Sequence, residues 1–178
     1  MSTIKTNAIQ TVAGKPILNS TGSILQVVQG TLTSTFSSTA GQNAPVDIGL
    51  SASITPSSTS SKILITVSIG GISGSSDTTH GFLLLRGGTS IGAGIPSGAR
   101  VGVIAQSGHA YSGGTWRGNP IVFSYLDSPS TTSATTYKVQ GGGNGGTTWY
   151  INQTGRDNNG ASEDSRAASS IILMEVSG

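Results

Sequence analysis

Residues 46–54 read Val-Asp-Ile-Gly-Leu-Ser-Ala-Ser-Ile. Apolar side chains occupy every second position of this stretch, and Asp, Gly and Ser lie between them. Successive side chains of a β-strand point to opposite faces, so a period of two is typical of a strand with one face toward a core and the other toward water. The stretch therefore predicts a half-buried strand.

The same kind of segment recurs along the chain without any helical periodicity between the copies. Each copy is bounded by turn residues such as Thr55-Pro56-Ser57 or the glycine run 141–146, where Gly supplies positive φ and Pro presets φ. Strands at this spacing indicate an antiparallel β-sandwich or jelly roll. We therefore predict an all-β fold. The other expected strands are 24–29, 62–69, 82–86, 100–106, 121–126, 136–140, 147–152 and 170–176.

The composition excludes several classes of protein. Of 178 residues only 9 are basic and 7 acidic, and the basic ones are scattered singly, so no stripe of positive charge indicates nucleic-acid binding. The chain has no Cys, which excludes disulfides and thiolate metal sites. It has neither a run of 18 apolar residues nor an apolar leader, so neither a secretory signal nor membrane insertion is expected.

No catalytic pattern emerges, and we predict that the chain is not an enzyme. Hydrolysis of a polysaccharide requires two carboxylates close together in a cleft. Here Asp47 and Glu175 lie on expected strands and the other acids punctuate loops, so the acids are expected to be solvated turn residues or strand-edge charges. No Gly-x-Ser-x-Gly elbow precedes a helix, and His80 and His109 suggest no site. The seven acids are Asp47, Asp77, Asp127, Asp157, Glu163, Asp164 and Glu175.

The loop 157–164 gathers oxygen ligands of the kind that Ca²⁺ prefers, in the order Asp-Asn-Asn-Gly-Ala-Ser-Glu-Asp. Its Gly stands at the fourth position rather than at the sixth, where an EF-hand loop has it, and no helix is expected on either side. We predict an Asx-turn loop, no metal and no cofactor, and calcium at this loop stays open as an alternative.

The closing segment 170–176 reads Ser-Ile-Ile-Leu-Met-Glu-Val and is apolar on both faces. In a sandwich one face of such a strand meets the opposite sheet, so the other face needs a second partner. Another copy of the chain is the simplest partner. We predict a subunit interface at Ile172, Met174 and Val176.

Residues 1–22 differ from the rest, because their apolar side chains are too sparse for a core of their own. We expect this segment either to dock on a neighbour or to wind with copies of itself. The domain prediction is accordingly a short extended N-terminal segment, 1–22, and a β-sandwich head, 23–178. The candidate anchor side chains of the first segment are Ile4, Ile9, Val12, Ile17 and Leu18.

The loop 109–119 places aromatic rings and a planar cation where packing does not obviously require them. Aromatic faces stack on sugar rings, and Arg and Asn donate hydrogen bonds to hydroxyls. Tyr111, Trp116, Arg117 and Asn119 are therefore a candidate glycan or host contact. The alternative is that Trp116 fills the end of the sandwich or a contact between subunits.

Several stretches resemble small fibre and appendage proteins of tailed bacteriophages, particularly marine ones. The resemblance rests on residues 2–10, 14–18, 22–28, 61–65, 125–129, 136–140 and 169–176 and covers most of the chain. The late Thr-Tyr-Lys-Val-Gln strand, an exposed loop and an apolar closing strand are also similar to the trimeric jelly rolls of tumour necrosis factor and the complement globular heads.

The phage resemblance implies a homotrimer, an N-terminal segment that attaches to other virion proteins, and a distal head that faces the host cell. From it we predict a non-enzymatic structural protein of the virion, a trimeric tail-fibre or appendage tip that contributes to attachment. The alternatives are a capsid decoration fibre, a carbohydrate-binding module and a polysaccharide depolymerase. A host-surface glycan is the expected ligand.

Overall fold

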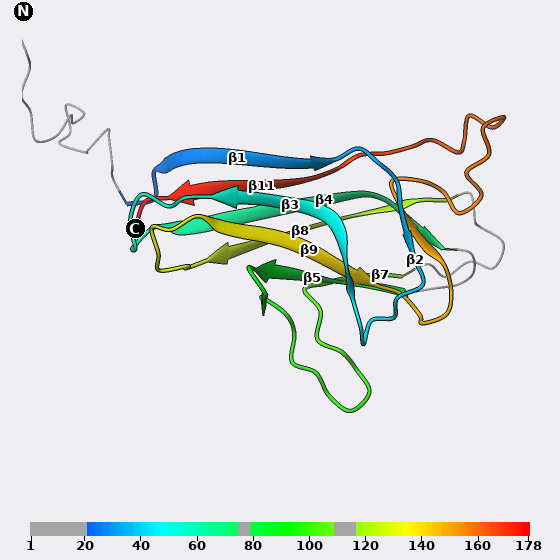
Figure 1. The fold of residues 1–178 in the computed structure, drawn as a ribbon, viewed down its shortest axis with the longest axis horizontal. Helices are drawn as coiled ribbons and strands as arrows, with labels where there is room; N and C mark the ends of the chain where they lie inside the picture. The colour runs from blue at the N-terminus through cyan, green and yellow to red at the C-terminus, as the bar shows by residue number, and fades with distance from the viewer. Residues whose placement is uncertain (1–20, 75–78, 109–116) are drawn as a thin grey trace, which may run out of the picture.

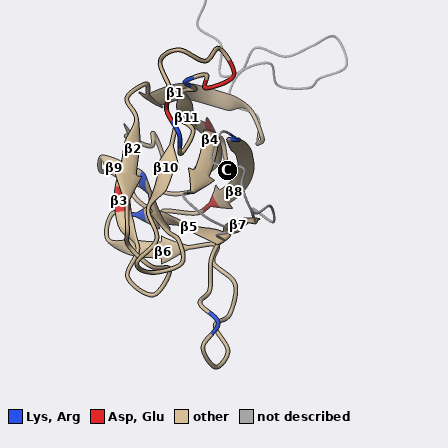
Figure 2. Ribbon diagram, turned by 90° about the vertical axis from the view of Figure 1, so that its right-hand side faces the viewer, with Lys and Arg blue, Asp and Glu red and all other residues tan. Residues whose placement is uncertain are grey.

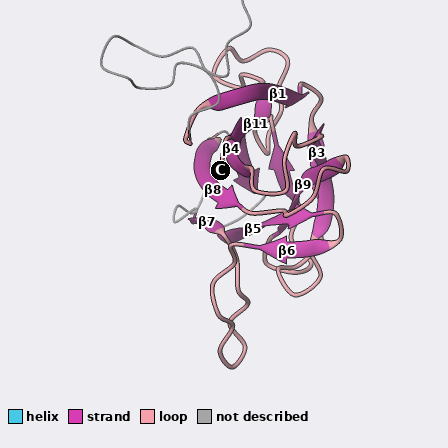
Figure 3. Cartoon of the chain, turned by 90° about the vertical axis from the view of Figure 1, so that its left-hand side faces the viewer, coloured by secondary structure: helices cyan, strands magenta, loops and turns pink. Residues whose placement is uncertain are grey.

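The computed structural model describes residues 21–74, 79–108 and 117–178, and within these ranges every regular element is a β-strand. Figures 1 and 3 show the strands stacked in two layers. The predicted all-β class is confirmed, and all pairs of named strands are antiparallel. No membrane-spanning helix is found in the part of the chain that the structure describes.

The first sheet has four long strands in the order β1, β11, β4 and β8. The long strand β4 continues past β11 and pairs there with the short strand β10, which pairs on its other side with the short strand β2. The bounds are β1 Ile24–Leu32, β2 Phe36–Ser38, β4 Lys62–Gly74, β8 Asn119–Asp127, β10 Trp149–Ile151 and β11 Ser169–Val176.

The second sheet runs in the order β3, β9, β5 and β6, and β7 extends the same edge of β5. Its bounds are β3 Val46–Ile54, β5 Thr79–Arg86, β6 Thr89–Ile91, β7 Ala105–Gly108 and β9 Thr135–Gly142. The two sheets face each other across one apolar core, so the predicted β-sandwich is correct.

The core follows from the period-two pattern of the strands. Alternate residues of β4, from Ile63 to Ile69, are completely buried, and β3 alternates as the sequence predicts, from Ile48 to Ile54. Trp149 is also fully buried, whereas its neighbour Tyr150 is half-buried on the other face of β10. The sequence predicts that only one of these two rings belongs to the core, and the structure confirms it.

The expected strand at 100–106 is wrong over most of its length, because sheet pairing begins only at Ala105. Residues 92–104 instead form a hairpin that projects from the sandwich, below the sheets in Figure 1. The backbone amide of Gly94 donates to the carbonyl of Val103 at 3.1 Å. The two arms therefore satisfy each other rather than extend a sheet. The short strands β2 and β6 were also not predicted.

The glycine run 141–146 begins within β9 and is partly a packing feature rather than a turn, as its first three residues are buried. A Cβ on Gly142 would lie 2.5 Å from the carbonyl oxygen of Gly41, and one on Gly141 would lie 3.0 Å from the ring of Trp149. Only glycine fits such approaches of backbone to backbone and backbone to indole. The expectation of turns holds only for Gly145 and Gly146, which are exposed.

The described chain begins and ends at the same end of the sandwich (Figure 1). The amide of Gly22 donates to the carbonyl of Ser177, and the amide of Ser177 donates to the carbonyl of Ser23, both at 2.8 Å. The loops 143–148 and 152–168 lie at the opposite end. The head therefore has two distinct ends, one next to the N-terminal segment and one made of loops.

Candidate interaction surfaces

The outer face of the first sheet carries one row that is apolar across all four long strands, whereas the next two rows are mostly polar, with Gln29, Thr66 and Ser124 in one and Thr31, Ser68 and Ser170 in the other. The strand register aligns Val27 with Met174, Met174 with Leu64, and Leu64 with Leu126 in one continuous row. Val27 is 58% exposed and Leu126 49% exposed, so the row is open to solvent on this chain. Because successive side chains of a strand point to opposite faces, each of the four strands contributes one outward apolar side chain to this row.

Further apolar residues surround this row, and we call the whole set the apolar face. Ile172 lies two pairs along from Met174 on the same face of β11, and Val176 lies beside Ile24, which is 57% exposed. The apolar face comprises Ile24, Leu25, Val27, Leu64, Leu126, Ile172, Met174 and Val176. Lys62, at the margin beside Val176, is the one charged side chain that these four strands direct outward.

The predicted interface residues Ile172, Met174 and Val176 all belong to the apolar face. Their strand neighbours Ile171 and Leu173 are completely buried in the chain's own core. One face of β11 therefore meets the opposite sheet, as the sequence predicts. What covers the other face stays a prediction.

The outer face of the second sheet is polar and internally hydrogen-bonded on β3 and β9, whereas β5 places Leu83 and Leu85 on the same face. Lys138 Nζ donates to Asp47 Oδ2 at 2.8 Å, and Gln140 Nε2 donates to Asp47 Oδ1 at 2.7 Å. Ser53 and Thr136 share a hydroxyl hydrogen bond of 2.7 Å. The hydrogen bond from Lys138 holds the pKa of Asp47 below its usual value. These polar side chains are hydrogen-bonded to one another and face water.

Glu175 contradicts the expectation that the acids are solvated, because its side chain is completely buried at the end of β11. Its carboxylate accepts from the amide and hydroxyl of Ser57 at 2.7 and 2.6 Å, and from Gln26 Nε2 at 2.6 Å. Burial alone would raise the pKa of Glu175, but the hydrogen bonds from Ser57 and Gln26 lower it to about 2. The carboxylate ties the β3–β4 turn to the last strand.

Asp127 is a second buried acid, at the end of β8. Arg86 Nη1 donates to both of its oxygens, at 2.9 and 3.0 Å, and Tyr137 Oη donates at 2.7 Å. Burial and the hydrogen bond to Asp127 raise the pKa of Tyr137. Arg86 and Tyr137 come from the opposite sheet, so this cluster joins the two layers.

The loop 157–164 engages its carboxylates with arginines. Asp164 accepts from Arg156 Nε at 2.7 Å, and this bond chiefly holds the pKa of Asp164 below its usual value. Arg166 Nη2 donates to Asp157 at 2.7 Å. The amide of Gly160 donates to Asn158 Oδ1 at 2.9 Å, which is the predicted Asx turn. No cluster of three or more metal-ligating His, Cys, Asp or Glu occurs in ranges 21–74, 79–108 and 117–178.

The structure leaves much of the predicted aromatic contact undescribed. Tyr111 and Trp116 lie outside the described residues, as do the anchor residues Ile4, Ile9, Val12, Ile17 and Leu18 and the histidine His109. Arg117 is exposed, and Asn119 is half-buried where it pairs with Ile72 at the start of β8. His80, for which the sequence suggests no site, is buried against the ring of Trp149.

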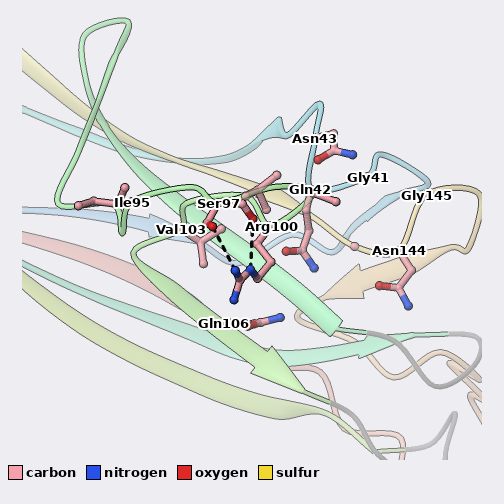
Figure 4. A pocket seen from close by; sticks show the side chains of 13 residues that line it. Gly41, Gln42, Asn43, Ile95, Ser97, Arg100, Val103, Gln106, Asn144 and Gly145 are labelled. Atoms are coloured by element: carbon pink, nitrogen blue, oxygen red, sulfur yellow. Dashed lines mark hydrogen bonds between the residues drawn. The ribbon is translucent and has the colours of Figure 1, made fainter.

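The structure adds a groove that the sequence does not predict. It has a volume of about 660 Å³ and lies between the projecting hairpin and two loops of the second sheet's end (Figure 4). Residues far apart in the sequence form it, so no local motif announces it. Its polar side chains are Gln42, Asn43, Ser97, Arg100, Gln106 and Asn144.

Comparisons with known proteins give distant similarity only. No protein-family model and no curated protein matches the sequence. A mutant VP2 protein of infectious bursal disease virus, in derived particles, is similar over 96% of this chain at 16% identity and a TM-score of 0.41. VP2 in the subviral particle of the same virus is similar over 86% at 13% identity and a TM-score of 0.37. The chain spans 42% and 38% of the length of those two chains.

Proposed function

We propose that this chain is a non-enzymatic structural protein of a bacteriophage virion, a homotrimeric tail-fibre or appendage tip that contributes to host attachment. The apolar face carries this proposal. A row of four solvent-facing apolar side chains, from Val27 to Leu126, is unsuited to a solitary soluble domain. It suits a chain whose copies pack together through this sheet.

The apolar face occupies one end of the sheet, from Ile172 to Val176 along β11, and measures about 19 by 17 Å, or roughly 320 Å². Two such faces in contact would bury about 650 Å², less than the roughly 1,200 Å² of a standard specific interface, so the polar residues around the apolar face would have to be covered as well. Because Lys62 is its one outward charge and lies at the margin, copies can approach without like-charge repulsion.

The strand order supports a jelly-roll head like that of the trimeric proteins which the sequence resembles. The eight longer strands divide into the sets β1, β11, β4, β8 and β3, β9, β5, β7, so the first and last strands of the chain are neighbours. Jelly rolls are built from two such sheets of four strands. The arrangement is also consistent with an anchor at one end, because the described chain begins beside Ser177, where Gly22 donates to its carbonyl, and the loops lie at the other end.

The absence of a catalytic task is consistent with the state of the described acids. An acid catalyst of glycan hydrolysis needs a carboxyl with a raised pKa. The pKa values of Asp47, Glu163, Asp164 and Glu175 are all held below their usual values by hydrogen bonds. A depolymerase is therefore disfavoured relative to a binding role.

Native mass spectrometry of the full chain tests the assembly. We expect a species of three times 17.8 kDa, and a species of 17.8 kDa would overturn the trimer. Deletion of residues 1–22 should leave the head folded by circular dichroism but abolish incorporation into particles. Normal incorporation of the deleted chain would overturn the anchor assignment and would favour attachment through the head itself.

The candidate host contact at Tyr111, Trp116, Arg117 and Asn119 is tested separately. Replacement of Trp116 by Ala should weaken adsorption to cells while the melting temperature stays within a few degrees of the parent. A large fall in melting temperature would instead assign the ring to packing. A capsid decoration fibre, the second candidate within the virion, would show particle incorporation without any effect of this substitution on adsorption.

A further inference from the structure

The groove beside the projecting hairpin has the size of a ligand site. Its volume of about 660 Å³ lies within the usual range for small-molecule pockets. One wall is the hairpin 92–104, which contributes Ile95, Ser97, Arg100 and Val103, and the other wall contains Gly41 to Asn43 and Gly143 to Gly145 (Figure 4). The lining is predominantly polar, unlike that of a pocket for an apolar ligand.

The hairpin wall holds its cation in a fixed position. Ser97 and Arg100 exchange backbone hydrogen bonds of 3.1 Å across a turn that contains Gly98 at a φ of 60°. Arg100 Nε then donates to the carbonyl of Ser97 at 3.2 Å, and Nη2 donates to the Ser97 hydroxyl at 3.1 Å. The guanidinium is therefore ordered by neutral groups and retains its full positive charge for a ligand.

The opposite wall is braced by the tight backbone approach of two loops. The amide of Gln42 donates to the carbonyl of Gly143 at 3.0 Å, and the side-chain amide of Gln42 donates to Thr79 Oγ1 at 3.1 Å. The Thr79 hydroxyl donates in turn to Asn144 Oδ1 at 3.1 Å. This series of hydrogen bonds orients the side chain of Asn144, whose amide nitrogen forms no hydrogen bond with another described residue.

The remaining polar groups suit a ligand that carries hydroxyls. Asn43 and Gln106 are exposed, and their side chains form no hydrogen bond with other described residues. Each primary amide offers both donors and an acceptor, which matches a hydroxyl in either role. Ile95, 96% exposed, and Val103 add apolar surface of the kind that contacts the C–H face of a sugar ring.

The charge of the groove selects among saccharides. Arg100 is its one charged lining residue, and the described lining contains no carboxylate. A guanidinium binds a carboxylate through paired N–H donors, and no acid in the lining repels one. Figure 2 shows how sparse the other charges on the head are.

We propose that the groove is a binding site for an acidic saccharide. The ligand's carboxylate binds Arg100, and its hydroxyls bind the amides of Asn43, Gln106 and Asn144. This proposal rests on the host-facing role proposed above and gives it a ligand class and a location. None of the residues that line the groove belongs to the predicted contact at Tyr111 to Asn119, and a trimer would present three such grooves and gain avidity from them.

Titration calorimetry of the full chain with two oligosaccharides of equal length tests the site. We expect oligogalacturonate, which carries carboxylates, to bind at least tenfold more tightly than neutral malto-oligosaccharide. Arg100→Gln should remove that preference, and the double substitution Asn43→Ala, Gln106→Ala should weaken oligogalacturonate binding severalfold. Lys62→Gln is the matched control, since it removes the same charge at the margin of the apolar face, on the other sheet and outside the lining of the groove.

Binding of oligogalacturonate that survives Arg100→Gln, or that falls equally with Lys62→Gln, would overturn the proposal and indicate diffuse electrostatic attraction. Binding of neither saccharide would also overturn it. Gly145→Leu provides a second variant, because a Cβ there meets only Gly41 Cα at 3.9 Å and the added side chain narrows the groove without strain. We expect it to reduce binding at an unchanged melting temperature, whereas unchanged binding would place the ligand elsewhere.

Native mass measurement on the same samples separates this proposal from the proposed function. A trimer that binds neither saccharide would overturn the groove site and leave the fibre assignment intact. A monomer that binds oligogalacturonate through Arg100 would support the groove site and overturn the trimeric fibre assignment.

Discussion

The two outer faces of the sandwich differ in how they meet the surroundings. On the second sheet, Asp47 accepts hydrogen bonds from Lys138 and Gln140, and the hydroxyls of Ser53 and Thr136 pair with each other. The first sheet also has a pair of hydrogen-bonded hydroxyls, on Thr66 and Ser124, but toward one end it carries Val, Met, Leu and Leu in one cross-strand row. The inner faces of both sheets are apolar and buried in one core, so the core does not explain why the two outer faces differ.

This contrast separates what a strand needs for its own fold from what it needs for assembly. A sheet with one buried face is stable when the other face is polar, as the second sheet demonstrates. Apolar side chains on the outer face of β11 therefore add nothing that the fold requires. They gain free energy only when a partner removes them from water, at roughly 25 cal/mol for each Å² buried.

The largest expected effect comes from a charge at the centre of the apolar face. Met174→Asp should raise the dissociation constant of the oligomer at least 100-fold, because an unpaired carboxylate would be buried between copies. Sedimentation or native mass measurement over a concentration series checks the result. The melting temperature of the isolated head should change little, since Met174 is only half-buried within one chain.

Ser51→Asp is the matched control on the other face, where the residue is exposed in β3. It should leave the oligomer intact. If both substitutions dissociate the oligomer equally, the contrast between the two faces has no bearing on assembly. If neither does, the apolar face is not the interface.

A smaller effect is expected on the inner side of the same strand. Glu175→Gln should lower the free energy of unfolding by about 2 kcal/mol, because hydrogen bonds from Ser57 and Gln26 to a charged oxygen are weakened. The folded-state pKa of about 2 lies below the ordinary value of 4.5, so the ionised form stabilises the fold above pH 4.5. That contribution is lost as the pH falls toward 2.

Denaturant unfolding of the parent and the Gln variant between pH 2 and pH 6 measures this contribution. The parent should lose stability with falling pH more steeply than the variant. Glu163→Gln, which removes an exposed acid paired with Arg156, is the comparison and should change the unfolding free energy by less than about 0.5 kcal/mol. Equal pH profiles for parent and Glu175→Gln would show that Glu175 is not the responsible group.

The smallest effect is expected on the polar outer face. Asp47→Asn removes the exposed ion pair with Lys138 and should lower the free energy of unfolding by less than about 1 kcal/mol. The difference between the parent and the variant should be smaller still at high salt, because salt screens the pair. Chemical denaturation at two salt concentrations tests this. A loss above 2 kcal/mol would mean that this face also contributes substantially to the fold.

Residue patterns predicted the sandwich because burial follows the period of each strand. This period predicted the alternation of residues 46–54 and the strand at 170–176, which is apolar on both faces. It also predicted that only one of Trp149 and Tyr150 belongs to the core. The prediction failed at 100–106, where a sequence of moderate hydrophobicity forms a hairpin arm. Local pattern does not distinguish a strand that joins a sheet from one that pairs with its own return segment.

The chemistry of the individual polar groups came from tertiary structure alone. The period of β11 places Glu175 on the same face as Ile171 and Leu173, but its donors Ser57 and Gln26 lie more than a hundred positions away, so the strand does not reveal its hydrogen bonds. The groove likewise unites Gln42, Arg100 and Asn144 from three separate loops. A strand's period is a local property and is written into consecutive residues, whereas hydrogen-bond partners and concave surfaces depend on which distant segments the sheet order brings together.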